Sequence, residues 1–345
     1  MERRNFIRSV AAGSVGLTMT GNGFSAGHLK GSSGKRIGII GLDTSHSVAF
    51  TQALNEPSAG PEFGGWKVVA AYPRGSNDIK SSVERIPGYT EDVKKLGVEI
   101  TGSIDELLRQ VDAVLLETND GRIHLEQALP VFRAGKRMFI DKPIAASLPD
   151  AIAIFNASGY YRVPVFSSSS LRYLPGIKEI KNGSAGKVIG ADTYSPATIE
   201  KTHPDLFWYG IHGVEALFTV MGTGCKSVTR IFTEGTDLVT GLWNNERIGT
   251  FRGIRAGRGD YGGTAFCEKA VVDLGKYSGY NPLLEQVVKF FDTGIPPVSQ
   301  EETIEIFAFM AAADESRKNG GRPVEISTIL QKARDDAGKI RIQGS

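Results

Sequence analysis

Between residues 35 and 166, short apolar segments alternate with stretches of helical spacing, and this alternation constrains the fold more than any other feature. Strands are predicted over residues 36–41, 67–72, 113–117, 137–140 and 163–166, with helices between them. Nearly continuous apolar strands separated by helices indicate a parallel sheet that is covered on both faces. The alternation therefore predicts an α/β domain with a doubly wound parallel sheet over residues 34–168.

After Ser167 the pattern changes to apolar and polar residues that alternate between Gly-rich turns. This alternation is typical of an antiparallel sheet. The segments concerned are residues 188–194, 227–233, 238–243, 247–252 and 265–273. Helical spacing returns over 283–291 and 301–318, where an Asn-Gly-Gly stop follows. Residues 169–328 are therefore predicted to form an α+β domain with a large, mainly antiparallel sheet, and residues 329–345 a polar C-terminal tail.

The composition narrows the class of partner. A chain of 345 residues suits two domains. The formal charge of +2 and the lack of a dense Lys/Arg run after residue 40 argue against nucleic acid or an anionic membrane as partner, so a small neutral ligand is expected. Cys225 and Cys267 are the two cysteines. They exclude a disulfide framework and give no zinc ligand set, so no metal is expected, and two buried thiols are favoured over one disulfide.

The first thirty-three residues are predicted to be an export signal and linker. An Arg-Arg-x-Phe-Ile-Arg run at residues 3–8 precedes a weakly apolar stretch at 10–19, which resembles a twin-arginine signal. The apolar stretch is too short and too polar to span a bilayer, so no membrane span is expected. The alternative is a basic, flexible N-terminus. A periplasmic location is therefore predicted, with a cytoplasmic location as the alternative.

The loop after the first strand stands where dinucleotide-binding folds hold a pyrophosphate against the start of a helix. The usual spelling is G-x-G-x-x-G, because side chains would block the approach of the phosphates. Here only Gly41 remains, while Asp43 and His46 occupy the second and third glycine positions. Thr44, Ser45 and His46 are candidate donors to the pyrophosphate. The Asp43 carboxylate would repel it unless that side chain turns away, pairs with a cation or binds a hydroxyl.

The end of the second strand bears on which cofactor is bound. The acidic residue that usually binds a ribose is missing there, and Arg74 and Ser76 follow instead. These two side chains suit a 2′-phosphate, which favours NADP slightly over NAD. The alternative is that both residues belong to a solvated loop.

A resemblance to a known family rests on four short segments. After the strand at 137–140 the sequence reads Asp141-Lys142-Pro143, which resembles the Glu-Lys-Pro signature of the Gfo/Idh/MocA family. This family includes glucose-fructose oxidoreductase and inositol dehydrogenase. Residues 118–124 resemble its Thr-Pro-x-x-x-His turn, residues 171–175 its Arg-containing strand exit, and residues 210–212 its Gly-x-His helix start.

The resemblance implies a Rossmann domain, a sheet domain used for oligomer contacts, and NAD(P)-linked oxidation of a sugar or cyclitol hydroxyl or the reverse reduction. A sugar-like substrate and a homo-oligomer are therefore expected. The residues predicted to contact NADP or NAD are Gly41, Asp43, Thr44, Ser45, His46, Arg74, Ser76, Thr118, Asn119, Asp141 and Lys142.

Two residues are predicted to be catalytic. Lys142, at the end of a strand, would donate hydrogen bonds to the reacting oxygen, and His212 would accept the hydroxyl proton as hydride leaves carbon. The alternative for Lys142 is an ordinary surface lysine before a turn proline. The alternative for His212 is a histidine of the core.

Five further residues are predicted to contact the substrate: Arg172, His203, Trp208, Tyr209 and Glu215. Many relatives have Asp-x-x-x-His, and here the Asp position is Trp208. Glu215 lies one helical turn after the proposed base, where a proton relay and a structural role are both open. Trp208 and Tyr209 offer flat faces for a sugar ring or pack in the core. His203 lies on a loop that could line the pocket.

Two other functions stay open on the sequence. One is an enzyme of the same fold whose bound nicotinamide oxidises a sugar transiently, so that a glycosidic bond is cleaved by elimination. The other is a carbohydrate-binding or scaffold protein without a cofactor. The second is favoured by Asp43, His46 and Trp208, which depart from the expected motifs.

Overall fold

The computed structural model describes residues 34–342, so the predicted signal at residues 1–33 lies outside the described part of the chain. The first domain is built on a parallel six-stranded sheet with the strand order β3-β2-β1-β4-β5-β6. Its strands are β1 (Arg36–Ile40), β2 (Lys67–Tyr72), β3 (Glu99–Ile100), β4 (Ala113–Leu116), β5 (Arg137–Ile140) and β6 (Val165–Ser167). The order reverses beside β1, which is the topology predicted from the strand and helix alternation.

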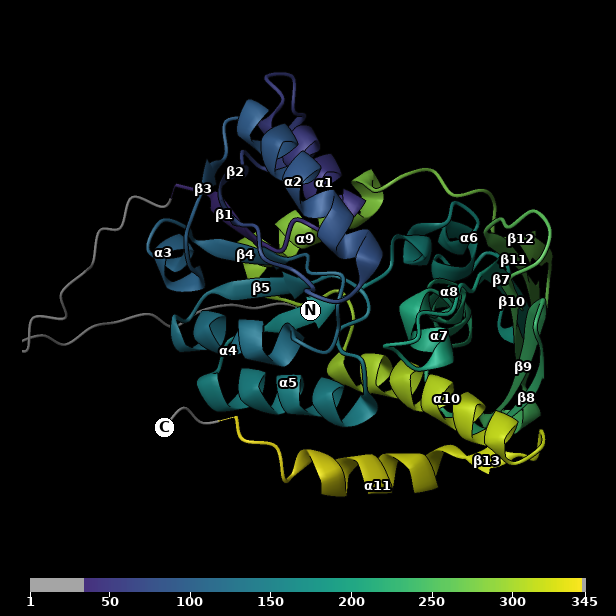
Figure 1. Cartoon of the computed structure of the whole chain (residues 1–345). Helices are drawn as coiled ribbons and strands as arrows, with labels where there is room; N and C mark the ends of the chain where they lie inside the picture. The colour runs from purple at the N-terminus through teal and green to yellow at the C-terminus, as the bar shows by residue number, and fades with distance from the viewer. Residues whose placement is uncertain (1–33, 343–345) are drawn as a thin grey trace, which may run out of the picture. The chain divides into compact units, whose positions relative to one another are not determined.

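Helices cover both faces of this sheet (Figure 1). They are α1 (Ser45–Asn55), α2 (Lys80–Lys95), α3 (Ile104–Leu108), α4 (His124–Arg133) and α5 (Leu148–Tyr161). The side chain of Thr44 caps α1 by accepting the His46 amide at 3.5 Å, and Ser47, Phe50 and Leu54 turn inward from this helix. The first turn of α1 therefore starts at the carboxyl edge of the sheet.

The second domain has a mixed seven-stranded sheet with the order β12-β11-β7-β10-β9-β8-β13. Only β7 and β10 run parallel, and the other neighbours are antiparallel. The strands are β7 (Val188–Pro196), β8 (Cys225–Thr233), β9 (Thr236–Trp243), β10 (Ile248–Ile254), β11 (Gly262–Cys267), β12 (Val271–Asp273) and β13 (Val324–Glu325). The predicted strand over 265–273 is thus a hairpin of two strands. The predicted fold class is confirmed.

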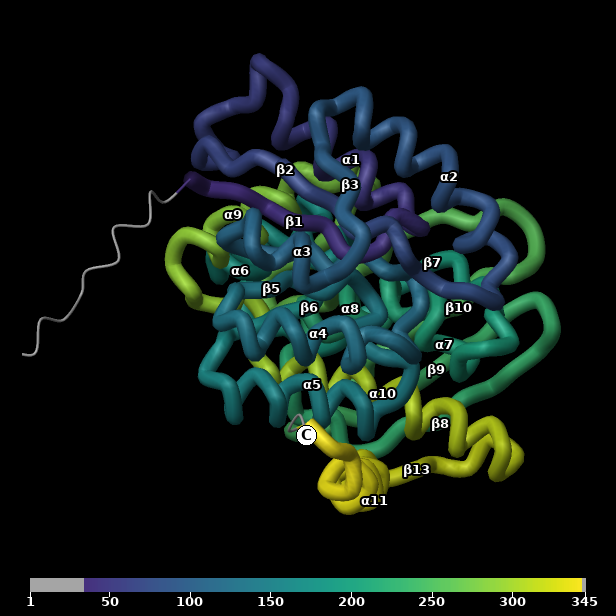
Figure 2. The backbone as a smooth tube through the Cα atoms, turned by 60° about the vertical axis from the view of Figure 1, so that its left-hand side comes forward, coloured from purple at the N-terminus to yellow at the C-terminus, as the bar shows by residue number. Residues whose placement is uncertain are grey.

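Helices pack on one face of the second sheet, toward the first domain (Figure 1). They include α8 (Ile211–Met221) and α10 (Gln300–Lys318). Helix α5 of the first domain packs against α10 and α11 (Ile326–Ala337), and the three lie side by side in Figures 1 and 2. The shorter elements are α6 (Ile177–Lys181), α7 (Asp205–Trp208) and the 3₁₀ turns Pro61–Phe63, Ser170–Tyr173 and Asn244–Glu246.

Helix α9 (Asn281–Thr293) shows that the chain returns to the first domain after building most of the second. Its residues Leu284, Val287 and Phe291 lie in the same apolar core as β1, and the Trp66 indole donates to Asp292 at 3.0 Å. The predicted boundary at residue 168 assigned α9 to the second domain. In the structure α9 packs with the first domain, because its apolar face covers the first sheet.

The predicted C-terminal tail at 329–345 includes most of a helix that packs against the rest of the chain. Residues 326–337 form α11, and Ile326, Ala333 and Ala337 are buried on one side of it. These residues recur at helical spacing, so the helix buries an apolar stripe although its other faces are polar. Residues 343–345 lie outside the described part.

Both cysteines are free thiols, and Cys225 is buried while Cys267 is half-buried. Among the described residues no helix is both long enough and apolar enough to cross a bilayer.

Candidate active site

A cavity of about 220 Å³ lies at the carboxyl edge of the first sheet, where the second domain faces it. It is lined by Thr44, Ser45, His46, Ser81, Arg85, Asn119, Lys142, Ser170, Leu171, Trp208, Tyr209, His212, Tyr261, Tyr277 and Tyr280. Ligands of α/β sheets bind at this edge, outside the ends of the strands next to the point where their order reverses.

Lys142 reaches this cavity from the end of β5. Its side chain is held among protein atoms, with 6% of the residue exposed, and its Nζ lies 6.0 Å from the centre of the Tyr209 ring. An ammonium at this distance from an aromatic face is attracted by the ring. Lys142 is therefore a buried, oriented cation in the cavity wall and not an ordinary surface lysine.

His212 faces the same cavity from the first turn of α8. Its Nδ1 lies 2.7 Å from the Ser169 hydroxyl oxygen, which also accepts the Leu171 amide at 3.1 Å. Burial lowers the pKa of His212 well below its usual value, and the charge of Lys142 lowers it further. The ring is therefore neutral near pH 7 and can accept a proton.

The loop before α1 packs tightly against the end of β4. Gly41 has a φ of +89°, and a Cβ there would lie 2.5 Å from the Thr118 backbone nitrogen. The glycine is therefore required by the protein's own packing. Thr44 and Ser45, at the start of α1, line the cavity, and the amide groups of a helix start favour an anion. This end of the cavity fits a phosphate-bearing cofactor.

The Asp43 side chain is turned away from the cavity and is fully buried. Its Oδ1 accepts the Asn119 amide at 2.9 Å, and its Oδ2 accepts the Ser76 amide at 3.1 Å. Burial raises the pKa of Asp43, while the two amide bonds act in the opposite direction. The side chain thus joins the loops that follow β2 and β4.

These two loops are also joined by a side-chain network. The Ser76 hydroxyl donates to Asp120 at 2.8 Å, and the Arg122 guanidinium binds both Asp120 and Asp78. Arg74 is exposed and lies outside the cavity lining. The side chains proposed to bind a 2′-phosphate are therefore not gathered in the cavity, and Ser76 is bonded to two carboxylates.

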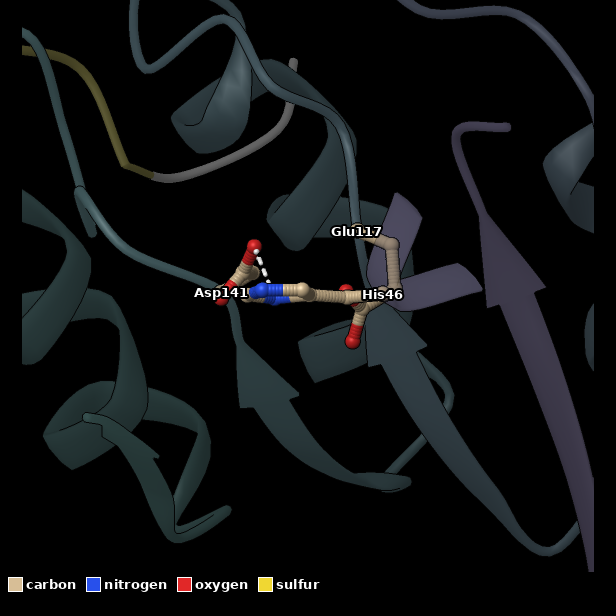
Figure 3. Close-up of side chains that lie close together, drawn as sticks. All are labelled: His46, Glu117 and Asp141. Carbon is tan, nitrogen blue, oxygen red and sulfur yellow. Dashed lines mark ion pairs between the residues drawn. The ribbon is translucent and has the colours of Figure 1, made fainter. Parts of the chain in front are cut away.

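Asp141 belongs to a buried cluster that the sequence did not predict. His46 Nδ1 lies 2.9 Å from Asp141 Oδ2, and one ligand-type atom each from His46, Glu117 and Asp141 lie within 4.8 Å of one another. Figure 3 shows the three side chains converging from α1 and from the ends of β4 and β5. The expectation that no metal is bound rested on the two cysteines and did not consider this cluster, whose members are far apart in the sequence.

The charges of this cluster affect each other strongly. Burial raises the pKa of Glu117 well above its usual value, and the charge of Asp141 raises it further. Burial acts in the same direction on Asp141, but His46 and Lys142 together hold its pKa at about 2. The cluster therefore contains one firmly ionised carboxylate beside a second whose negative charge is unfavourable.

Two of the predicted substrate residues bind each other outside the cavity. The Arg172 Nε donates to Glu215 at 2.9 Å, and its Nη1 donates to Glu302 of α10 at 2.6 Å. Glu215 also accepts the Ser169 amide and the Ser168 hydroxyl. This buried network joins the end of the first domain to α8 and α10, so its geometry is that of a structural contact.

The remaining predicted substrate residues separate into two groups. Trp208 and Tyr209 line the cavity, and the Tyr209 hydroxyl lies 2.8 Å from that of Tyr261. His203 lies behind Trp208, with ring centres 4.9 Å apart, and its Nε2 accepts the Gly121 amide at 3.2 Å. His203 therefore supports the wall and does not face the cavity.

Several lining residues were not predicted from the sequence. Tyr261, Tyr277 and Tyr280 come from loops and form an aromatic side, while Arg85 stands on α2 at the opening. Their loops are Gly-rich and lack periodicity, so no pattern placed them at the site. The one available signal was the presence of three tyrosines within twenty residues of glycine-rich chain.

Comparison with known proteins supports the resemblance. Residues 35–166 match the model of the oxidoreductase family with an NAD-binding Rossmann fold, GFO_IDH_MocA. The match covers the first domain. An uncharacterized oxidoreductase of Streptococcus pneumoniae serotype 4 is 25% identical over 153 residues, which cover 39% of this chain. The match spans 41% of the length of that curated relative. The first domain is therefore similar to NAD-binding Rossmann domains of oxidoreductases.

Solved structures extend the likeness in fold to the second domain. A "probable dehydrogenase" from Thermotoga maritima has a TM-score of 0.69 at 20% identity, covering 85% of this chain and 99% of that one. Scyllo-inositol dehydrogenase from Lactobacillus casei, solved with NAD(H) and scyllo-inositol, has a TM-score of 0.65 at 14% identity, covering 85% and 99%. UDP-N-acetylglucosamine 3-dehydrogenase from Acidithiobacillus ferrooxidans has a TM-score of 0.66 at 15% identity, covering 81% and 97%.

Proposed function

We propose that the protein is an NAD(P)-dependent oxidoreductase that acts on a hydroxyl or keto group of a sugar or cyclitol. The observation that carries the proposal is the convergence of Lys142 and His212 on one small cavity at the carboxyl edge of the parallel sheet. Lys142 belongs to the first domain and His212 to the second. The sequence predicts complementary roles for them, as hydrogen-bond donor and as proton acceptor. A cation beside a neutral imidazole can hold an oxygen and remove its proton.

The cofactor would be held at the α1 end of this cavity. Thr44 and Ser45 offer donors at the helix start, and Asn119 lines the neighbouring wall. When bound, the nicotinamide supplies or accepts the hydride. The preference for NADP over NAD rests on Arg74 and Ser76. It loses support because Ser76 is bonded to Asp78 and Asp120 and because Arg74 lies away from the cavity.

The two catalytic side chains would divide the remaining chemistry. Lys142 would donate to the reacting oxygen and stabilise the negative charge that develops on it. His212 would take the hydroxyl proton, which its lowered pKa permits near neutral pH because the ring is then uncharged. Ser169 orients the ring through the contact at Nδ1, so that the other side of the imidazole is available to the cavity.

The proposed substrate class follows from the walls of the cavity. Trp208, Tyr209 and Tyr261 offer aromatic faces and hydroxyl groups, which suit the apolar faces and the rim hydroxyls of a ring polyol. The names of the Lactobacillus casei and Acidithiobacillus ferrooxidans enzymes identify an inositol and an amino-sugar nucleotide as their substrates. Both compounds carry ring hydroxyls.

Two further proposals come from the sequence. The run at residues 3–8 supports export by the twin-arginine route to the periplasm, which cell fractionation with and without the first 33 residues would test. The resemblance to the family supports a homo-oligomer. The exposed apolar side chains of Leu242, Ile248, Phe266 and Val271 on the second sheet provide a surface for it.

Cofactor analysis tests the central proposal. Purified protein is denatured and the released small molecules are identified by mass spectrometry, and NAD⁺ and NADP⁺ are titrated into the native protein. Saturable binding of either nucleotide, followed by its reduction in the presence of cyclitols or free sugars, is expected. If neither nucleotide is released or bound, the oxidoreductase proposal is wrong.

A further inference from the structure

In the buried cluster of His46, Glu117 and Asp141, the Glu117 carboxylate has no partner among residues 34–342, although the His46 imidazole lies beside Asp141. Glu117 is 0% exposed, and neither of its carboxylate oxygens has a hydrogen-bond partner within the described chain. Asp141 is also fully buried, and its two oxygens likewise make no hydrogen bond. Buried carboxylates are normally paired or hydrogen-bonded, because an unpaired charge is strongly unfavourable away from water.

The contact between His46 and Asp141 involves one oxygen of Asp141 and leaves both oxygens of Glu117 without a partner in the described part of the chain. Nδ1 lies 2.9 Å from Oδ2, but the alignment is not that of a hydrogen bond. One imidazole nitrogen and one oxygen of each carboxylate therefore lie within 4.8 Å of one another, and the His46–Asp141 pair is the contact marked in Figure 3.

We propose that this cluster is a binding site for a divalent transition-metal ion such as Zn²⁺ or Mn²⁺. One imidazole and two carboxylates are a mixed nitrogen and oxygen donor set, which suits these ions better than Mg²⁺. Ligand bonds of about 2.0–2.2 Å place two ligands of one ion up to roughly 4.4 Å apart. The ligand atoms already lie within 4.8 Å of one another, so small side-chain movements would complete the site.

The supporting structure is rigid, as a metal site requires. Glu117 follows β4, and its amide donates to the Ile40 carbonyl at 2.7 Å. Asp141 follows β5, and its amide donates to the Leu116 carbonyl at 2.9 Å. The Phe50 and Tyr280 rings pack against the imidazole of His46, with centres 5.5 and 4.4 Å away. Each ligand is thus fixed by a strand end or by packed rings.

The position of the site gives it a role beside the cavity. His46 lines the cavity directly, and Lys142 follows Asp141 in the chain. Three protein ligands leave coordination positions for water or a substrate oxygen. This inference does not rest on the proposed redox function, because metal binding is measured without substrate or nicotinamide.

The test uses the full chain, purified without a polyhistidine tag and treated with a chelator. Zn²⁺, Mn²⁺ and Co²⁺ are titrated calorimetrically, and the bound metal is counted by mass spectrometry. We expect about one ion per chain and a loss of affinity of roughly tenfold or more in Glu117→Gln, which keeps the shape but removes a charged ligand. Asp112→Asn is the matched control, because Asp112 lies at the other end of β4 and binds Arg36. The metal affinity of this variant should equal that of the wild type.

The alternative occupant is a proton shared between the two carboxyl groups. No saturable binding of any of the three ions would overturn the proposal, as would binding that Glu117→Gln leaves unchanged. If Glu117→Gln does not fold, the visible absorption spectrum of the Co²⁺-loaded wild type is the deciding measurement. An absorption band of Co²⁺ with nitrogen and oxygen ligands is expected, and its absence would overturn the site. NAD⁺ binding by the chelated chain is recorded separately, so failure of the metal site and failure of the redox proposal are distinguishable.

Discussion

The side chain of Asp43 joins the two loops that flank the start of α1. Each carboxylate oxygen accepts one main-chain amide, from Ser76 and from Asn119, and no cavity wall includes the residue. A glycine at this position would leave both amides without an acceptor. The aspartate at this glycine position therefore has a structural role, because its two carboxylate oxygens accept these two amides.

Replacing Asp43 by Asn tests this interpretation. The variant keeps the shape but presents an NH₂ group to one of two amide donors, so we expect the free energy of unfolding to fall by about 1–3 kcal/mol. Urea denaturation followed by circular dichroism measures the change. Asp112→Asn, which breaks an exposed pair with Arg36, should cost less. Equal effects of the two substitutions would mean that the Asp43 bonds are not important for stability.

Lys142→Met is expected to leave the fold intact and to lower turnover by roughly a hundredfold or more. The methionine preserves the length of the side chain but cannot donate to an oxygen. The rate of NAD⁺ or NADP⁺ reduction is measured over a panel of cyclitols and free sugars. Lys95→Met, an exposed substitution on α2, is the control and should keep the wild-type rate. Unchanged activity in Lys142→Met would remove this residue from the catalytic machinery.

At the scale of single residues, the sequence predicted the members of the site that follow strand ends or begin helices. Lys142 and His212 are examples, since parallel strands end at one edge and the helix start is set by its own residues. Glu117 was missed because its partners are about 24 and 71 positions away, a pairing that only the sheet order creates. The pairing of Arg172 with Glu215 was missed for the same reason.

At the scale of elements, the loop between β7 and α7 carries a buried histidine. His203 accepts the Gly121 amide through Nε2, so the ring must be unprotonated at that nitrogen. Burial lowers the pKa of His203 to about 4, although Asp120 at 3.6 Å acts in the opposite direction. Between pH 6.5 and 4 the unfolded chain therefore binds a proton on this residue that the folded chain does not bind.

The sign of the resulting pH dependence is definite. Because the unfolded state binds more protons in this range, the contribution of His203 to stability is complete above pH 6.5 and is lost as the pH falls toward 4. We expect His203→Gln, whose side-chain oxygen can accept the same amide, to flatten this part of the pH profile. Urea denaturation at several pH values compares the two proteins. Parallel profiles would contradict the assignment of a buried neutral histidine.

Periodicity predicted most elements because each buries one face or both faces along its whole length. β1, β2 and β5 are apolar throughout, and their bounds lie within one residue of the predicted ones. The exceptions are elements whose burial depends on distant partners. α11 buries a narrow stripe on α5 and α10, and β3 is two residues long, so neither was recognisable in the sequence alone.

At the scale of the whole molecule, the outward face of the second sheet carries an unbroken apolar row. The register places Val271 beside Phe266 and Ile248 beside Leu242, and both pairs flank Gly190. These four side chains are 40–68% exposed. The row crosses five strands, and its exposed side chains lie on the face that α8 and α10 do not cover. Contiguous exposed apolar surface of this kind marks an interaction site.

The oligomer proposal predicts that this row mediates self-association of the chain. Two copies could pack their sheets face to face, which is an isologous contact with the same surface on both copies. Ile248→Lys places a charge within the row, beside Gly190, and we expect it to shift the mass measured by light scattering toward that of the monomer. Val83→Lys is the matched control, because Val83 is exposed on α2 in the first domain, far from the row. A wild-type chain that is monomeric at micromolar concentration, or an Ile248→Lys variant that keeps the wild-type mass, would show that this face is not the interface.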